Sequence, residues 1–224
     1  YSLMKENNLP VIEKKLLNVE ENEFNEDHIL KPRFGGSSIG VEVINDIGTA
    51  KKLVKNSDLY SQGAVIEKYL KNSIDLLIGV RNFPTFDVSE IEKPIKNETL
   101  FSYSDKYLEN GGLEGSKREL PAELNKDLEA QIINLVKKIN SLIPTRGIYR
   151  YDFLLHENEL YVNEINTIPG SHALYLWKNL NNSKFELLDN MIDEALSNVS
   201  NSWSITGSDG IALKSAKDID SKLG

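Results

Sequence analysis

Two carboxylates, an amide and a guanidinium lie close together in the sequence near residues 150 and 165. They belong to an Arg-Tyr-Asp stretch and an Asn-Glu-Ile-Asn stretch, and the four polar residues are Arg150, Asp152, Glu164 and Asn166. Carboxylate and amide oxygens are the ligands that Mg²⁺ prefers, with waters and phosphates in its remaining positions. A guanidinium beside them can hold a phosphate through two parallel hydrogen bonds. These residue types indicate a magnesium and phosphate site, provided that the fold brings the two stretches together.

A β-hairpin is the element that would bring these two stretches together. Strand-like patterns run over 147–155 and 160–166, and the segment between them is polar. Because side chains alternate faces along a strand, the two polar residues of each stretch share a face. A three-residue turn over 157–159 would place the two carboxylates opposite each other and the guanidinium opposite the amide. The alternative is a solvated hairpin face whose ion pairs have no function. The tight turn over 167–170, directly after the second stretch, favours a functional site over this alternative.

A glycine-rich stretch follows Lys31. Gly35, Gly36, Ser37 and Ser38 stand between two expected strands, so their amide N–H groups can point into one concavity and bind a phosphate. The stretch is not a Walker A loop, because its lysine precedes the glycines and no helix is expected to start there. A strand-to-strand turn with nothing bound is the alternative interpretation.

Two further stretches show weaker patterns. Alternation over 65–70 puts Glu67 and Tyr69 on one face, which by itself is typical of an amphipathic strand. An aromatic and basic cluster over 103–107 precedes a loop over 108–119 that contains three glycines and is long enough to act as a lid. Each stretch taken alone is an ordinary surface feature.

The remaining pattern is a mixture of helices and strands without an internal repeat. A helix over 121–143 has the most regular apolar spacing, and Pro121 suits its first turn. The stretch 83–116 is typical of irregular chain or an edge strand with a long loop. The other expected elements are strands over 29–32, 40–44, 64–70 and 74–80 and helices over 46–59 and 185–199, followed by a polar tail from residue 200.

Composition limits the kinds of partner. The 224 residues are 40% hydrophobic and 27% charged, which is enough for one large core or two small coupled ones. A net charge of −8 argues against a nucleic-acid partner, and no apolar run is long enough to span a membrane. The absence of cysteine excludes disulfides and thiolate sites and agrees with a cytoplasmic location.

In their order along the chain, these motifs resemble the ATP-grasp part of the D-alanine–D-alanine ligase family. The motifs are Lys-Pro-(x)₃-Gly-Ser-Ser-Ile-Gly-Val, Glu-Lys-Tyr-Leu, Lys-Tyr before a loop, Arg-Tyr-Asp-Phe and Asn-Glu-Ile-Asn-Thr-Ile-Pro-Gly, between about Leu9 and Leu196. The resemblance implies an α+β ATP-grasp fold, in which two α+β lobes with antiparallel sheets sandwich the nucleotide. The implied parts are a central lobe over 1–70, a C-terminal lobe over 71–200 with the lid loop 108–119, and a tail over 201–224.

The resemblance also implies a role for each matched residue. Lys31 and Lys106 match phosphate-binding lysines, and Asp75 stands where the family has a ribose-binding glutamate. The full set implied to bind ATP is Lys31, Gly36, Ser37, Ser38, Glu67, Lys68, Leu70, Asp75, Lys106 and Asn163. Glu67, Lys68 and Leu70 in this set match the linker that contacts adenine.

The resemblance implies three further groups of residues. Asp152, Glu164 and Asn166 match the ligands of two Mg²⁺ ions, with Mn²⁺ as a substitute. The implied catalytic residues are Arg150, which stabilises the transferring phosphoryl group, and Ser37 and Tyr107, which lock the closed lid. The implied contacts to the second substrate are Gly170, Ser171 and His172.

The reaction implied by the resemblance is ATP-dependent formation of a peptide bond through an acylphosphate. The first interpretation is a D-alanine–D-alanine ligase-like enzyme of peptidoglycan precursor synthesis, with ATP and small amino acids as its substrates. One alternative is a ligase of the same mechanism that joins other amino acids or amines in a specialised or surface-polymer pathway. Another is a nucleotide-binding module without catalysis.

The chain departs from the family pattern at two places. Residues 170–175 are about two residues shorter than usual, and Ala173 aligns with a serine that holds the acceptor carboxylate, so the second substrate stays open. The family also has a preceding domain with further substrate contacts, whereas this chain starts at Tyr1. We therefore expect a fragment that binds nucleotide without efficient ligation, and a homodimer only in the full-length protein.

Overall fold

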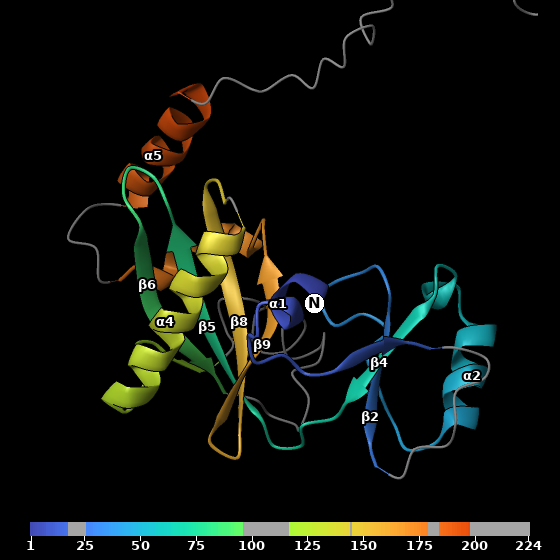
Figure 1. Ribbon diagram of the computed structural model, residues 1–224. Helices are drawn as coiled ribbons and strands as arrows, with labels where there is room; N and C mark the ends of the chain where they lie inside the picture. The colour runs from blue at the N-terminus through green and yellow to red at the C-terminus, as the bar shows by residue number, and fades with distance from the viewer. Residues whose placement is uncertain (18–25, 96–116, 144, 179–183, 198–224) are drawn as a thin grey trace, which may run out of the picture.

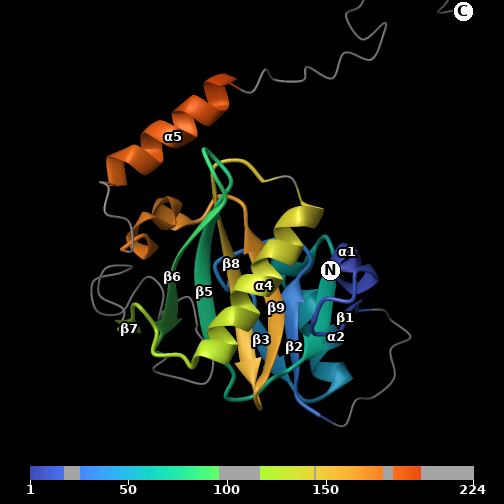
Figure 2. The same cartoon turned by 60° about the vertical axis from the view of Figure 1, so that its left-hand side comes forward.

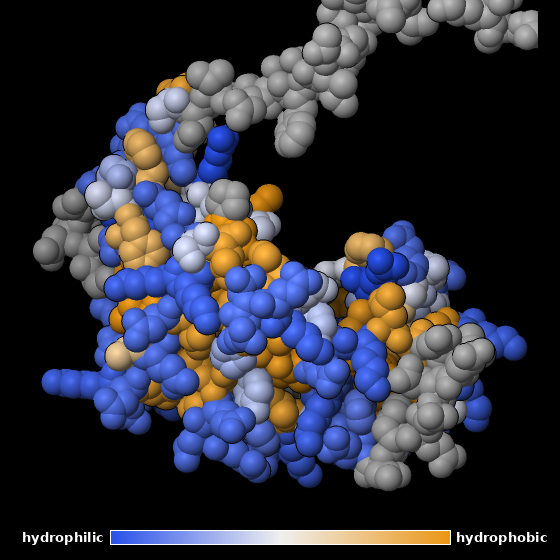
Figure 3. All heavy atoms as spheres, viewed as in Figure 1, coloured by the Kyte–Doolittle hydropathy of each residue, from blue (hydrophilic) through white to orange (hydrophobic). Residues whose placement is uncertain are grey.

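Two antiparallel sheets organise the chain and lie side by side (Figure 1). The molecular surface is indented between them (Figure 3). The computed structural model describes residues 1–17, 26–95, 117–143, 145–178 and 184–197. Antiparallel strands with helices packed on single sheet faces define an α+β protein, so the predicted fold class is confirmed. None of the helices in these ranges is long and apolar enough to cross a membrane.

The smaller sheet has four strands in the spatial order β1 (Lys14–Leu16), β4 (Ala64–Lys68), β2 (His28–Pro32) and β3 (Glu42–Ile44). Helix α2 (Ile47–Asn56) and the 3₁₀ helix η1 (Asp58–Tyr60) cover one of its faces. Helix α2 begins at Asp46, whose carboxylate accepts a hydrogen bond of 2.8 Å from the amide of Thr49. The buried residues between sheet and helices are Leu30, Ile44, Ala50, Tyr60, Ala64 and Ile66.

The larger sheet has five strands in the order β7 (Arg118–Glu119), β6 (Asp87–Pro94), β5 (Ile74–Arg81), β8 (Ile148–His156) and β9 (Glu159–Asn166). Helix α4 (Lys126–Leu142) lies across one face of this sheet (Figure 2). The core between them includes Leu76, Ile78, Val80, Ile132, Val136, Ile139, Tyr151 and Phe153. Because side chains alternate, the neighbours of these strand residues point to the opposite face. This face, called here the open face, is free of α4 and is covered in part by η3 (Gly170–Leu176) and Trp177.

The two chain ends of the described region also pack on the larger sheet. Helix α1 (Ser2–Glu6) contributes Met4, and Leu9 joins it in the same core as α4. The 3₁₀ segment η3 (Gly170–Leu176) and helix α5 (Lys184–Ser197) form a third cluster with Ile148 of β8. The predicted lobe boundary at residue 70 falls between the two sheets, and residues 1–9 pack with the larger one.

The structure differs from the predicted elements in ways that local patterns explain. Residues 87–94 form strand β6, within the stretch 83–116 for which the sequence predicts irregular chain or an edge strand with a long loop. Strand β6 lies second in the sheet, beside the two-residue edge strand β7. The predicted helix over 121–143 starts only at Lys126, because the side chain of Asn125 accepts the amide of Leu128 at 2.8 Å and caps the helix there. The predicted helix over 46–59 divides at Ser57, whose φ of −132° is not helical.

Other differences are smaller. The predicted strands over 40–44 and 64–70 are shorter, at Glu42–Ile44 and Ala64–Lys68. Residues 118–119 of the predicted lid loop form β7, which pairs with β6. The sequence predicts neither α1 nor β1.

Candidate functional site

Strands β8 and β9 form the predicted hairpin and bring the four polar residues together. Arg150 lies opposite Asn166, and Asp152 lies opposite Glu164. The predicted pairing is therefore confirmed. These positions alternate with Tyr151 and Phe153, which face α4, so the polar residues point to the open face.

The pairing is right, but the predicted three-residue turn is wrong. His156 pairs with Glu159, so the turn has only two residues, and both have left-handed backbone, with φ of 49° at Glu157 and 68° at Asn158. Such a turn alone would place Asn163 opposite Asp152. A bulge between Val162 and Glu164 adds one residue to β9 and restores the pairing. The two irregularities together put both carboxylates on the open face.

Arg150 and Asn166 surround the carboxylate of Asp152. The guanidinium donates two hydrogen bonds of 2.7 Å, one to each oxygen of Asp152. The amide nitrogen of Asn166 donates to Asp152 at 3.0 Å and to Glu164 at 3.1 Å. Burial raises the pKa of Asp152 to about 7 against the opposing effect of Arg150, and the neighbouring Glu164 carboxylate raises it further. A cation in addition to the guanidinium of Arg150 would be favourable here, because the carboxylates of Asp152 and Glu164 share that single guanidinium.

The donor set of this hairpin fits a hard divalent cation. Two carboxylates and one amide converge from adjacent strands, and rotation of the Asn166 amide by half a turn would exchange its nitrogen for its oxygen. Oδ2 of Asp152 already accepts from both Arg150 and Asn166, so a cation would bind Asp152 through the second lone pair of Oδ1 or after Arg150 has moved away. Within the described part of the chain, no group of three or more His, Cys, Asp or Glu residues is placed to hold a metal ion. The protein ligands that this hairpin offers are two carboxylates and one amide.

A third carboxylate, that of Glu92 in β6, lies on the same line of paired residues across the strands as Asp152 and Glu164. It is not among the residues predicted from the sequence. Glu92 of β6 lies opposite Leu77 of β5, which in turn lies opposite Asp152. Glu92 is therefore on the open face, about 10 Å from Asp152 at two strand spacings. Its carboxylate accepts a hydrogen bond of 2.8 Å from the hydroxyl of Tyr175 and lies 3.4 Å from Arg118. Burial raises the pKa of Glu92, opposed by Tyr175 and Arg118.

The signal for Glu92 was weak because it depended on recognising β6. Even as part of a strand, Glu92 has little to distinguish it in the sequence, because its neighbours are Ile91 and the charged Lys93. Tyr175 gave no local signal, because it reaches Glu92 from η3 across 83 residues of sequence.

The smaller sheet places two predicted nucleotide residues in contact. Lys31 donates a hydrogen bond of 2.6 Å to Glu67, whose side chain is only 7% exposed. A second lysine, Lys14 of β1, lies 3.0 Å from the other oxygen of Glu67 and was not predicted. Burial and the neighbouring Lys14 lower the pKa of Lys31, opposed by Glu67. This buried carboxylate is shared by two ammonium groups on the face opposite α2.

The other residues predicted to bind nucleotide are spread over both sheets. Lys68 is on the face of β4 opposite to Glu67 and pairs with Glu26 at 2.8 Å. Leu70 is buried just beyond the end of β4. Asp75 is on the open face of β5, in the same alternation as Leu77. Sheet alternation thus separates Lys68 from Glu67.

The glycine-rich stretch forms an exposed turn between β2 and β3. Ser37 and Ser38 have left-handed backbone, with φ of 56° and 59°. The amide of Ile39 donates to the carbonyl of Gly36 at 3.1 Å, and that of Val41 donates to Ser38. These two amides serve the turn itself, and phosphate binding by the remaining ones stays a prediction.

The predicted contacts to the second substrate lie in η3. Ser171, His172 and Ala173 all have φ of about 50°, which is a rare run of left-handed residues. Ser171 and His172 are exposed, and Ala173 is fully buried with Leu176 and Trp177. Gly170 is also exposed, and a side chain at its position would point into open space.

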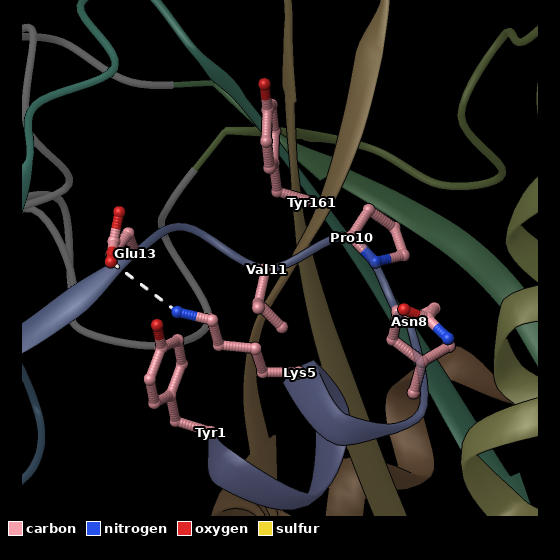
Figure 4. Close-up of a pocket in the computed structure, with 8 residues that line it drawn as sticks. Tyr1, Lys5, Asn8, Pro10, Val11, Glu13 and Tyr161 are labelled. Carbon is pink, nitrogen blue, oxygen red and sulfur yellow. Dashed lines mark hydrogen bonds and ion pairs between the residues drawn. The ribbon is translucent and has the colours of Figure 1, made fainter.

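Two predicted residues, Lys106 and Tyr107, and most of the predicted lid lie outside the described residues. A pocket of about 520 Å³ is lined by the N-terminal segment and Tyr161 and contains none of the predicted site residues (Figure 4). A second, of about 260 Å³, is lined by Lys14, Asn163 and Glu164 together with apolar residues of α1 and β9. Of these two pockets, only the second touches the hairpin site.

Comparison with known proteins places this geometry in a family. The sequence profile described as D-ala D-ala ligase C-terminus matches residues 1–193. The D-alanine–D-alanine ligase of Thermosipho africanus is 31% identical over 205 residues, covering 86% of this chain and 55% of that protein. The corresponding ligase of Helicobacter pylori strain HPAG1 is 35% identical over 155 residues, covering 69% of this chain and 43% of that protein.

Solved structures agree on the fold. The crystal structure of the Helicobacter pylori ligase matches with a TM-score of 0.64 and 26% identity, covering 86% of this chain and 56% of that one. The N5-carboxyaminoimidazole synthetase of Staphylococcus aureus in complex with ADP has a TM-score of 0.60 at 22% identity, over 86% of this chain and 49% of that one, and shares the fold alone. The chain spans about half the length of the curated relatives it matches. The chain therefore belongs to the D-alanine–D-alanine ligase C-terminal family and has an ATP-grasp fold.

Proposed function

We propose that this chain is the nucleotide-binding and catalytic part of an ATP-dependent carboxylate–amine ligase. The reaction class that we favour is D-alanine–D-alanine ligation for a peptidoglycan precursor in the cytoplasm. The observation that carries this proposal is the convergence of Arg150, Asp152, Glu164 and Asn166 on one open sheet face. Membership of the family supports the reaction class.

The chemistry assigned to the hairpin follows from its charges. Bound ATP and Mg²⁺ supply a transferable phosphoryl group and much of the positive charge that its transfer needs. Asp152, Glu164 and Asn166 would hold the metal through oxygen atoms, and Arg150 would donate hydrogen bonds to the oxygens of the phosphoryl group. A substrate carboxylate oxygen bonds to the γ-phosphorus of ATP as the bond to the bridging oxygen breaks, so ADP leaves and an acylphosphate forms. An amine nitrogen then bonds to the acyl carbon, phosphate leaves, and the amine loses one proton.

The remaining predicted residues have supporting roles in this proposal. Lys31 and the turn over 36–38 hold the phosphates, and Asp75 holds the ribose. Glu67, Lys68 and Leu70 contact adenine, with Lys68 contributing through its backbone because its side chain lies on the opposite face of β4. Asn163 of the larger sheet adds a further contact to ATP, which suits a ligand that spans both sheets. Lys106 and Tyr107 complete the site from the lid loop.

Calorimetric titration of Mg-ATP into the whole chain tests this proposal. We expect Glu164→Gln to weaken Mg-ATP binding by at least about tenfold, because it removes a metal ligand. Glu157→Gln is the matched control, since Glu157 is an exposed glutamate of the same hairpin at the turn. Equal binding by Glu164→Gln and the unsubstituted chain would mean that the hairpin is not the metal site.

A second candidate function is a ligase of the same mechanism with a different acceptor. Complete burial of Ala173 favours it, because the residue aligned with the family's serine contacts the core. Ser171 and His172 are the exposed alternatives for holding an acceptor group. Release of ADP in the presence of a panel of D-amino acids, L-amino acids and amines tests it. Turnover with D-alanine alone would exclude this candidate.

A further inference from the structure

Lys14 touches both sheets at the place where the candidate nucleotide and metal residues meet. It lies directly opposite Glu67 in the β1–β4 pair, with its ammonium 3.0 Å from the Glu67 carboxylate. The same ammonium donates a hydrogen bond of 3.3 Å to the carbonyl of Asn163. Asn163 is the bulge residue of β9 and directly precedes Glu164. One side chain thus connects the Glu67 position of the smaller sheet with the hairpin of the larger one.

The charges around Glu67 are not balanced. Lys31 and Lys14 contact one oxygen each of a single carboxylate, at 2.6 and 3.0 Å. The side chains of both lysines are mostly buried, at 26% and 17% exposed. The three groups together carry a net charge of +1, and a buried excess charge is unfavourable unless a counter-ion approaches. This cluster therefore favours an anion on the exposed side of Lys31.

A single lysine would serve such an anion poorly. If Lys31 were the only partner of Glu67, its movement toward a phosphate would leave a buried carboxylate without a positive neighbour, which is strongly unfavourable. Lys14 removes this conflict, because it keeps its contact with Glu67 while Lys31 turns away. The carbonyl of Asn163 holds Lys14 in that place.

We propose that Lys14 is a positioning residue of the nucleotide site: it neutralises Glu67 when Lys31 binds phosphate, and it fixes the smaller sheet to the hairpin bulge. This inference rests on the proposed function. Lys14 itself contacts only protein groups in this proposal. Its effect on the bound phosphate is indirect and acts through Lys31.

Mg-ATP titration of charge variants in the whole chain tests this role. We expect Lys14→Met to weaken Mg-ATP binding by about tenfold, the size of one moderately strong ionic contact. Lys14→Arg keeps the charge and is expected to restore most of the affinity. Lys5→Met is the matched control, because Lys5 forms an exposed ion pair of 3.5 Å with Glu13 outside the site (Figure 4). It is expected to bind like the unsubstituted chain.

A double variant separates charge relief from general damage to the fold. In a Glu67→Gln background Lys31 has no carboxylate to leave uncompensated, so adding Lys14→Met is expected to cost at most about twofold. A tenfold loss of Mg-ATP affinity on adding Lys14→Met to both the unsubstituted chain and the Glu67→Gln variant would overturn the charge role. A Lys14→Arg variant that binds Mg-ATP as weakly as Lys14→Met would also overturn it. A folded Lys14→Met variant with unchanged affinity would overturn the inference while leaving the proposed function intact.

A ligand-free measurement covers the case in which the proposed function fails. If the unsubstituted chain binds no Mg-ATP, the proposed function is wrong, and the rate of amine acylation at Lys31 still tests the coupling. Because Lys14 lowers the pKa of Lys31, Lys14→Met is expected to slow acylation of Lys31 at pH 8, and Lys14→Arg is expected to restore the rate. Unchanged rates would overturn the inference.

Discussion

At the scale of single residues, the polar side chains of the hairpin satisfy one another. Arg150 and Asn166 take up the oxygens of Asp152, which is 6% exposed. Removing one partner of a buried charged pair is far more harmful than removing an exposed one. Arg150 therefore has two tasks in our proposal, a structural one toward Asp152 and an electrostatic one toward phosphate.

The raised pKa of the buried Asp152 carboxylate predicts how the stability of the fold depends on pH. Burial raises the pKa of Asp152 to about 7, and an aspartate in an unfolded chain has a pKa of about 3.9. Between about pH 4 and pH 7 the folded state holds a proton that the unfolded state has released, so the free energy of unfolding falls as the pH rises through this window. Urea unfolding from pH 4 to pH 8 measures this.

The matching variants identify the group that is responsible. Asp152→Asn cannot titrate and is expected to flatten the decrease between about pH 4 and pH 7. Asp189→Asn, on the exposed side of α5, is expected to keep it. A decrease that persists unchanged in Asp152→Asn would contradict the assignment.

At the scale of elements, the hairpin turn holds a residue in an unfavourable conformation. Glu157 has a φ of 49°, where a left-handed backbone costs roughly 1–2 kcal/mol for most residues and less for Asn. We expect Glu157→Asn to raise the free energy of unfolding by about 1 kcal/mol. The ion pair lost with it is weak, since His156 and Glu157 are 3.8 Å apart and Glu157 is exposed. Lower stability of this variant in urea unfolding would rule out strain at this turn.

Helix α4 supports the site without touching the open face. Ile132 is fully buried between α4 and the sheet, so Ile132→Ala is expected to lower the free energy of unfolding by about 2–5 kcal/mol. Because the open face is on the other side of the sheet, Mg-ATP affinity per folded molecule is expected to change by less than about twofold. Denaturant unfolding and calorimetry on the same sample measure both. Loss of binding in a folded variant would show that α4 affects the site through the sheet.

The sequence predicted these elements unevenly, for a physical reason. Helix α4 has a strong periodic pattern because it buries one face in the core, and β5 is a continuous apolar run because it is buried on both faces. Strands β8 and β9 are recognisable from their apolar positions on either side of a polar turn. The stretch that contains β6 is predicted only as irregular chain or an edge strand, because charged residues interrupt its apolar positions. Tyr175 and Arg118 compensate the buried carboxylate of Glu92 there. The two-residue turn and the bulge offset each other, which local patterns could not reveal.

At the scale of the whole molecule, a ligand that spans both sheets is distinguishable from one that binds only the hairpin. We expect Mg-ATP to slow amide hydrogen exchange in β4 and β9 together, since binding shifts the equilibrium away from local opening. Mg²⁺ alone is expected to slow exchange in β8 and β9 only. Protection by Mg-ATP confined to β9 would contradict a nucleotide site between the sheets.

The charge of the whole chain makes a separate prediction about partners. A net charge of −8 gives no general attraction for a polyphosphate backbone. We expect fluorescence anisotropy of a labelled DNA duplex to stay unchanged with up to micromolar chain at low salt. Binding that weakens steeply with added salt would overturn this expectation.

The sequence by itself determined the residue types, their alternation and the family resemblance. Those features are local: Arg150 and Asp152, like Glu164 and Asn166, share a face because they are two residues apart on a strand. Only the tertiary structure revealed the contacts of Glu92 with Tyr175 and of Lys14 with Asn163, which are 83 and 149 residues apart in sequence. Sheet register, a compensating bulge and the packing of η3 decide such contacts. These depend on the balance of packing over the whole chain, which no local pattern contains.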